Sequence, residues 1–183
     1  MRIAMTGSSG TGKTTMMKEL KELLPSYKTF SSVQRTLHTV VKDFGTSEET
    51  TDFTQTCILG VMVYNLKEYP DQLNDRSLLC NFAYSDTSEK VKNSEFLRKQ
   101  FEDAIELYDI IFYFPHGEFE CQEDGFRSTD YNFHKKIDIE IQKNIELYKD
   151  KVKIVKVTGS VEERLHTMIT ELGYLGVDLE FPF

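Results

Sequence analysis

The N-terminal stretch MRIAMTGSSGTGKTTMMKEL limits the fold more than any other part of the chain. A short apolar run, Ile3 to Met5, leads into a glycine-rich segment that fits the pattern G-x-x-x-x-G-K-[ST]. Apolar residues then recur at helical spacing, at Met16, Met17, Leu20, Leu23 and Leu24. This order predicts a strand, a tight loop and a helix.

A loop of this kind suits phosphate groups. Glycines let successive backbone N–H groups point into one hollow, and the helix N-terminus adds partial positive charge. Lys13 is expected to reach the β- and γ-phosphates of a triphosphate, and the Thr14 hydroxyl to bind Mg²⁺. The residues that we expect to surround the phosphates are Ser9, Gly10, Thr11, Gly12, Lys13 and Thr14.

A chance match by a serine- and glycine-rich turn is the alternative. It is disfavoured because a strand before the loop and a helix after it are the context that the pattern requires. The loop therefore predicts a nucleoside triphosphate site. It does not by itself separate a kinase from a GTPase, a motor or a switch.

Length and charge narrow the class of protein. The 183 residues are expected to form one domain, residues 1–183. We expect no signal peptide and no membrane span, since the first apolar run is short and leads directly into the loop. Cys57, Cys80 and Cys121 show no paired spacing, which fits a reducing cytoplasm. The net charge of −8 makes a polynucleotide an unlikely substrate, because nucleic acids require a basic face.

Alternating strands and helices predict an α/β fold. We expect strands at residues 2–6, 27–30, 72–75, 109–115 and 152–157. Helices are expected from the loop to near Pro25 and at residues 31–44, 51–68, 94–108, 131–148 and 160–172. The last begins with a Ser-x-x-Glu capping box, and the helix at 51–68 places Phe53, Cys57, Val61 and Tyr64 on one face. The alternation predicts a parallel sheet covered by helices on both faces.

Ligands of parallel sheets bind at the carboxyl ends of the strands. We therefore expect the segments after Phe30, around Asp75 and after Pro115 to lie near the loop. Asp75 and Arg76 suit phosphoryl transfer, in which a carboxylate orients Mg²⁺ or accepts a proton and a cation offsets charge on the moving group. The alternative is a surface salt bridge.

The segment after Pro115, HGEFECQEDGFRSTDYNFHKK, is long and polar. Such a stretch is typical of a lid or a binding loop, which we place at about residues 116–133. Arg127 lies within it, and Lys135 and Lys136 lie just beyond. A lid cation would close over the phosphates and exclude water. The alternative is a solvated loop with incidental charges.

Together, GSSGTGKTT, the strand-end DRS and the late EDGFRSTD resemble the P-loop nucleoside and nucleotide kinases. The nearest resemblance, from residue 2 to about 172, is to small kinases and kinase-like ATPases grouped with ribosylnicotinamide kinases and phage-type deoxynucleotide kinases. Many of these are described only as AAA-type ATPases. The resemblance implies a P-loop three-layer sandwich with a five-stranded parallel sheet in the order 2-3-1-4-5. It also implies ATP and Mg²⁺ as the donor pair and a mobile lid.

The resemblance assigns roles on the donor side. Lys13 and Thr14 keep their loop roles, and Thr15 touches the α-phosphate side. Asp75 becomes the base or the metal-orienting carboxylate. Arg76 and the lid residue Arg127 supply catalytic cations.

On the acceptor side, the resemblance implies that Arg35 and Arg76 face the acceptor and that Gln55 reads a base or a sugar. For Gln55 the alternative is a helix-surface glutamine. The chain departs from the family in two ways. Lys135 and Lys136 stand where relatives carry a second lid arginine, and lysine supplies charge but no bidentate fork. In addition, the fourth strand ends in Pro115 with no clear acidic residue directly after it, which shifts the metal role to Asp75.

These observations predict an ATP-dependent phosphotransferase of nucleotide metabolism. A deoxynucleoside monophosphate is the favoured acceptor, because Arg35, Arg76 and the lid cations suit a substrate that already bears a phosphate. Ribosylnicotinamide or another nucleoside is the alternative, and a polynucleotide 5′-kinase ranks third. A regulatory NTP-binding or hydrolysing module is the rival of another class, although no N-K-x-D signature of a GTPase occurs. The aromatic tail LGYLGVDLEFPF either packs on the core or meets a second subunit of a homodimer.

Overall fold

The computed structural model describes residues 1–41, 44, 49–118 and 130–181. Its centre is one sheet of five parallel strands in the order β2-β3-β1-β4-β5, as the resemblance implies. In the central strand, Ile3 pairs with Leu73 on one side and with Ile110 on the other. The strands are β1 (Arg2–Thr6), β2 (Lys28–Phe30), β3 (Gln72–Asn74), β4 (Ile110–Tyr113) and β5 (Lys153–Lys156).

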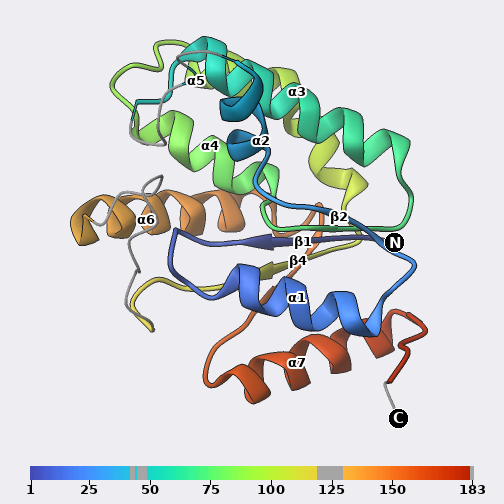
Figure 1. Cartoon of the computed structure of the whole chain (residues 1–183). Helices are drawn as coiled ribbons and strands as arrows, with labels where there is room; N and C mark the ends of the chain where they lie inside the picture. The colour runs from blue at the N-terminus through green and yellow to red at the C-terminus, as the bar shows by residue number, and fades with distance from the viewer. Residues whose placement is uncertain (42–43, 45–48, 119–129, 182–183) are drawn as a thin grey trace.

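Helices cover both faces of the sheet, which gives three layers (Figure 1). One face carries α1 (Lys13–Leu23) and α7 (Val161–Tyr174). The other carries α3 (Asp52–Glu68), α4 (Leu78–Thr87), α5 (Ser94–Phe101), the short 3₁₀ helix η1 (Glu102–Leu107) and α6 (Tyr131–Tyr148). The remaining helix, α2 (Val33–Val40), packs against α3. No helix in the described parts of the chain combines the length and the apolar character that a bilayer crossing requires.

The central strand is apolar throughout because both of its faces are buried. Ile3 and Met5 pack with the side chains of α1 and α7, whereas Ala4 packs with those of α3 and α4. Such a strand shows no alternation of apolar and polar residues, in agreement with the short apolar run in the sequence.

Two of the expected helices differ in extent from the structure. The helix expected at residues 31–44 ends at Val40, and the one expected at 94–108 divides into α5 and η1. Most of the expected lid, with Arg127, falls on residues 119–129, which lie outside the described residues. The capping box of α7 is confirmed: the Ser160 hydroxyl accepts a hydrogen bond from the Glu163 N–H at 3.2 Å.

The sequence pattern missed α4 entirely. Residues Leu78 to Ser85 are all buried. A helix that is buried on all sides has no polar face, so the 3.6-residue periodicity that marks an amphipathic helix is lost. This helix supplies one wall of the pocket described below.

The apolar face expected for α3 does not face the core. Phe53, Val61 and Tyr64 are exposed, and Cys57 is half-buried. The buried face instead consists of Thr54, Gln55, Ile58, Leu59, Met62, Asn65 and Leu66. Because α3 is apolar on nearly all sides, periodicity does not identify its inner face. Of the polar residues on that face, Gln55 and Asn65 line a pocket, and Thr54 belongs to the capping box of the helix.

The C-terminal tail packs on the core, one of the two alternatives expected for it. Val177 and Leu179 contact the apolar cluster between α1 and α7. The Glu180 N–H donates to the Leu23 carbonyl at 2.9 Å. The tail therefore closes the end of this helical layer.

Candidate functional site

The phosphate loop, residues 7–14, joins the end of β1 to the start of α1. Gly12 is the N-cap of α1 and has φ +88°, in the left-handed region that favours glycine. At Gly7, with φ +151°, an added Cβ would collide with the backbone carbonyl oxygen of Phe114. Both fixed glycines of the sequence pattern are thus required by the backbone.

Lys13 is folded over its own loop. Its ammonium donates to the Ser8 carbonyl and to the Thr11 hydroxyl, with an Nζ–Oγ1 distance of 2.9 Å. The side chain is 6% exposed. Phosphate oxygens are stronger partners for an ammonium than these neutral oxygens are. We therefore expect Lys13 to exchange its loop contacts for phosphate contacts when a nucleotide binds.

Thr14 and Asp75 form an oxygen pair beside the loop. The Thr14 Oγ1 lies 3.4 and 3.5 Å from the two carboxylate oxygens of Asp75. Asp75 follows β3 directly, and its N–H donates to the Phe30 carbonyl at 3.0 Å, which fixes its position.

This pair fits Mg²⁺ in ligand type. Magnesium prefers hydroxyl, carboxylate and phosphate oxygens, and octahedral coordination sets neighbouring ligands about 3 Å apart. Among the described residues, no group of three or more His, Cys, Asp or Glu side chains gathers as a metal cage. Phosphates of a bound nucleotide would therefore have to supply further ligands, as is usual for Mg²⁺.

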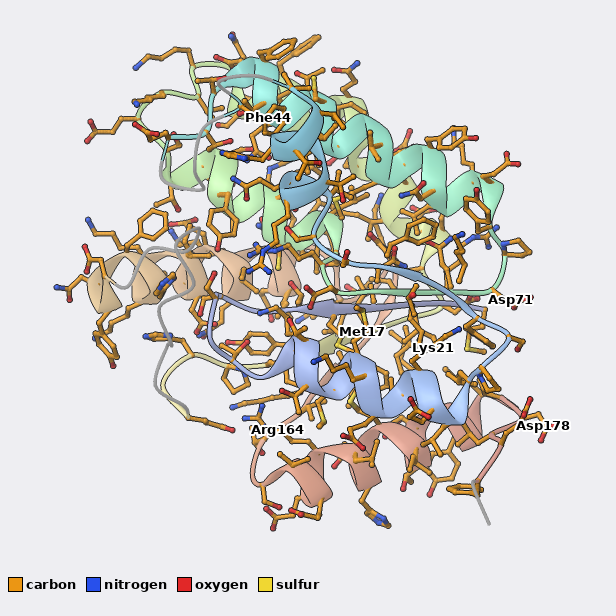
Figure 2. All side chains as sticks on the ribbon, viewed as in Figure 1. Met17, Lys21, Phe44, Asp71, Arg164 and Asp178 are labelled. Atoms are coloured by element: carbon orange, nitrogen blue, oxygen red, sulfur yellow. The ribbon has the colours of Figure 1, made fainter. Side chains whose placement is uncertain are left out.

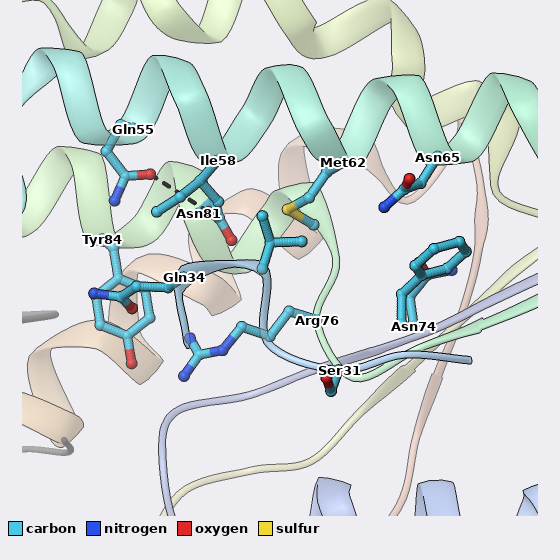
Figure 3. A pocket seen from close by; sticks show the side chains of 12 residues that line it. Ser31, Gln34, Gln55, Ile58, Met62, Asn65, Asn74, Arg76, Asn81 and Tyr84 are labelled. Atoms are coloured by element: carbon cyan, nitrogen blue, oxygen red, sulfur yellow. Dashed lines mark hydrogen bonds between the residues drawn. The ribbon is translucent and has the colours of Figure 1, made fainter. Parts of the chain in front are cut away.

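A pocket opens beside Asn74 and Arg76, the two residues that flank Asp75 in the sequence (Figure 3). Its walls come from the ends of β2 and β3 and from α2, α3 and α4. The lining residues are Phe30, Ser31, Val33, Gln34, Gln55, Ile58, Met62, Asn65, Asn74, Arg76, Asn81 and Tyr84.

Carboxamides dominate the polar part of the pocket. The Asn81 amide donates to the Gln55 Oε1 at 3.4 Å (Figure 3). The Gln55 Nε2 donates to the Thr50 hydroxyl at 2.7 Å. The Asn81 Oδ1 is buried and has no hydrogen-bond partner within the described residues. A buried acceptor without a partner is costly. A ligand that donates a hydrogen bond here would remove that cost.

Tyr84 connects the pocket to the phosphate loop. Its hydroxyl lies 3.4 Å from the Ser9 hydroxyl, and the Arg76 guanidinium stacks 5.1 Å from the centre of its ring. Burial alone would lower the pKa of Arg76, but Tyr84, Cys80 and Asp75 raise its pKa overall, so the guanidinium remains a cation. Pocket, cation and loop therefore form one continuous site.

The sequence matches a family model described as "AAA domain" over residues 2–164. The chain belongs to the AAA domain family. A comparison with curated proteins found no significant match. The family assignment agrees with the phosphate loop at the N-terminus of the matched region.

Solved structures share the fold of this AAA domain. Deoxyadenosine kinase from M. mycoides, described with products dCMP and a flexible dCDP bound, has a TM-score of 0.70 and 15% identity. The similarity covers 96% of this chain and 100% of that one. A NadR protein in complex with NR has a TM-score of 0.73 and 18% identity, over 99% of this chain and 52% of the other. The expected resemblance to P-loop nucleoside and nucleotide kinases is confirmed at the level of the fold.

Most of the expected site residues of this AAA domain lie together. Lys13, Thr14 and Asp75 meet at the phosphate loop, and Gln55 and Arg76 line the pocket. Thr15 is exposed on the first turn of α1, directly after Thr14. Arg35 is exposed on α2 and does not line the pocket. Arg127 lies outside the described residues.

The pocket residues on α4, Asn81 and Tyr84, were not predicted because the helix itself was not. On α2, Arg35 was predicted to face the acceptor, whereas its neighbour Gln34 lines the pocket. Adjacent positions on a helix point about 100° apart. Arg35 was chosen because a cation suits an acceptor phosphate. No signal in the sequence indicated which side of α2 faces the pocket.

His116 follows β4 and reaches the loop from the other side. Its Nδ1 lies 3.3 Å from the Ser8 hydroxyl, and its ring packs 4.7 Å from that of Tyr131 and 6.3 Å from that of His134, measured between centroids. Burial lowers the pKa of His116, and His134 and Lys135 lower it further, while Asp138 acts in the opposite direction.

This shift predicts a pH dependence of stability. Because the pKa of His116 is lower in the folded protein than its unfolded value of about 6.5, protonation favours the unfolded chain. The contribution is fully present above pH 6.5 and is lost as the pH falls towards the folded pKa. We expect the free energy of unfolding of His116→Asn, measured by urea titration, to depend less on pH between 7 and 5 than that of the wild type. His166→Asn, exposed on α7, is the control; equal pH slopes for all three proteins would contradict the assignment.

Proposed function

We propose that this AAA domain transfers the γ-phosphoryl group of ATP to a hydroxyl group of a nucleoside. The observation that supports this most is the pocket itself. Its wall includes Arg76, which follows Asp75, and Tyr84, which contacts Ser9 of the phosphate loop. It also holds a buried acceptor, the Asn81 Oδ1, that has no partner among the described residues. A module that only binds or hydrolyses ATP needs no such pocket.

The chemistry of the pocket suits a nucleoside. Carboxamide side chains donate and accept hydrogen bonds, as the edges of bases and the hydroxyl groups of sugars do. Apolar side chains of Phe30, Ile58 and Met62 supply contacts for a flat ring. The solved structures that share the fold include one titled as a deoxyadenosine kinase and one titled as a complex with NR, which supports an acceptor of this class.

The pocket favours a nucleoside over the deoxynucleoside monophosphate expected from the sequence. Among the described lining residues, Arg76 alone is charged. Arg35, expected to hold an acceptor phosphate, is exposed and outside the pocket. A phosphomonoester carries up to two negative charges and usually takes several cationic partners. A neutral acceptor places no such demand on this site.

Three side chains have roles in the proposed reaction. Asp75 accepts the proton of the attacking hydroxyl or orients the metal, and its position at the end of β3 lies between pocket and loop. Lys13 turns from the Ser8 carbonyl to the transferred phosphoryl group. Arg76 offsets negative charge from the pocket side. Bound Mg²⁺ would neutralise charge on the phosphates from the position of Thr14 and Asp75.

An acceptor panel tests the proposal. ADP formation is measured with ATP and Mg²⁺ alone and with added nucleosides, deoxynucleosides, their monophosphates or ribosylnicotinamide. We expect ADP formation that depends on an added nucleoside, with kcat/KM at least about tenfold above that of the matching monophosphate. ATP hydrolysis at the same rate with every compound would contradict the proposal. A preference for monophosphates would contradict the choice of a nucleoside and would support the expected contact between Arg35 and an acceptor phosphate.

Gln55→Leu gives a second prediction, on the acceptor side. The substitution removes the hydrogen bonds to Asn81 and Thr50 and leaves both polar groups buried. We expect the KM for the acceptor to rise about tenfold or more, since leucine offers the acceptor no hydrogen bond and a polar group of the acceptor left unsatisfied in the pocket costs about 1–3 kcal/mol. The KM for ATP should change little. Steady-state kinetics in both substrates measures this. Thr56→Val, exposed on the same helix, is the control, and an unchanged acceptor KM in Gln55→Leu would exclude the assignment.

A further inference from the structure

Arg164 is a buried cation that the site described so far does not use. It lies in the first turn of α7 and is labelled in Figure 2. Only 1% of the residue is exposed. Its guanidinium lies 5.5 Å from the centre of the Phe114 ring. A guanidinium is kept inside a protein only when its N–H groups find partners, so its contacts indicate what it stabilises.

Those contacts join the ends of three neighbouring strands. One terminal nitrogen donates to the Thr11 carbonyl of the phosphate loop at 2.7 Å, and Nε donates to the Gly159 carbonyl, after β5, at 2.9 Å. The other terminal nitrogen pairs with the carboxylate of Glu118, after β4. The same carboxylate accepts from the Gly159 N–H at 3.2 Å. Because β1, β4 and β5 are adjacent, Arg164 holds one edge of the sheet together.

The contact with the Thr11 carbonyl has a direct consequence for phosphate binding. In a trans peptide the C=O and N–H groups point in opposite directions. A carbonyl that faces Arg164 therefore turns the N–H of Gly12 away from Arg164. Gly12 is also the N-cap of α1, where unpaired N–H groups bind anions. Arg164 thus sets the direction of one amide in the phosphate loop.

The position of Arg164 also suits the donor side. The acceptor pocket lies over β2 and β3, on one side of the loop. In-line transfer requires the acceptor and the leaving nucleotide on opposite sides of the moving phosphoryl group. The rest of the donor therefore extends towards the ends of β4 and β5, the segments that Arg164 connects.

We propose that Arg164 is a positioning residue for the donor nucleotide, which it serves by orienting the Thr11–Gly12 peptide and by fixing the segments after β4 and β5 against the loop. This inference rests on the proposed function in taking ATP as the ligand of the loop and the pocket as the acceptor site. Lysine cannot replace Arg164, because an ammonium lacks the planar fork that reaches three partners in fixed directions.

The test is ATP affinity, measured by isothermal titration without an acceptor. Arg164→Lys is expected to raise the dissociation constant for ATP at least tenfold. The matched control is Arg98→Lys. Arg98 also pairs with a carboxylate, Asp86, donates to Asn144 and stacks on a ring, Phe82, but it contacts no part of the phosphate loop. The melting temperature of Arg98→Lys should fall about as much as that of Arg164→Lys. Its dissociation constant for ATP should stay within twofold of the wild-type value.

The outcomes separate the two proposals. Wild-type affinity in Arg164→Lys, or an equal loss in Arg98→Lys, would overturn the role of Arg164 and leave the proposed function in place. A wild-type protein that binds no ATP would overturn both. If Arg164→Lys does not fold, Glu118→Ala decides instead, since it removes one of the three anchors of the guanidinium. A threefold or greater rise in the ATP dissociation constant supports the role, and an unchanged constant contradicts it.

Discussion

Lys13→Ala is expected to lower kcat by a factor of about a thousand or more, because transition-state cations on a transferred phosphoryl group contribute this much to catalysis. The ammonium is already inside the loop, within 2.9 Å of the Thr11 hydroxyl. It therefore needs only to change partners, and does not have to cross the site. No other lysine belongs to the loop sequence. Acceptor-dependent ADP formation under saturating substrates measures the effect.

Lys18→Ala is the matched control for this prediction. Lys18 lies on the same helix, α1, but is exposed. We expect the kcat of Lys18→Ala to stay within twofold of the wild-type value. Both variants should melt in a cooperative transition, as a folded protein does. Substantial activity in Lys13→Ala would mean that the transferred group does not bind at this loop.

Asp75→Asn is expected to lower kcat by a factor of about 10²–10⁴, the usual contribution of a general base. The substitution keeps the shape of the side chain but removes its charge, and the N–H that anchors Asp75 to the Phe30 carbonyl is untouched. ATP binding in the absence of acceptor should change less than about threefold, since Lys13 and the loop amides remain. Asp71→Asn is the control, because Asp71 directly precedes β3, at the end of the strand opposite to Asp75.

A magnesium titration separates the two roles of Asp75. If the carboxylate orients the metal, the Mg²⁺ concentration that gives half-maximal activity should rise in Asp75→Asn. If it acts only as the base, that concentration should stay constant while kcat falls. Full activity of Asp75→Asn under all conditions would rule out both roles.

The donor half of the site was predictable from the sequence because it is local. The pattern of the loop lies within eight residues, and Gly12 is needed there for its left-handed backbone. Gly7 is recognised by the same pattern, although the reason for it is the close approach of the Phe114 carbonyl from a distant strand end. Asp75 and Arg76 were found because the ends of parallel strands share one edge of the sheet. The strand order followed from the resemblance to a family with this fold, and local patterns alone do not determine it.

The acceptor half was less predictable because it depends on helix rotation and on contacts between distant residues. On α3 the apolar pattern pointed to Phe53 and Tyr64, which are exposed, while polar Gln55 faces inward. The fully buried α4 gave no periodic signal, so Asn81 and Tyr84 were missed. Arg164 meets Thr11 across 153 positions of sequence. Nothing in the local sequence of either residue indicates that contact.

The fate of the γ-phosphate tests the central claim most directly. The protein is incubated with ATP labelled in the γ-phosphate, Mg²⁺ and the nucleoside that best supports ADP formation, and the labelled products are separated. The account predicts that the label appears as a phosphomonoester of the nucleoside, in amounts equal to the ADP formed. Label found only as inorganic phosphate, with the nucleoside unchanged, would contradict it and identify a hydrolysing module.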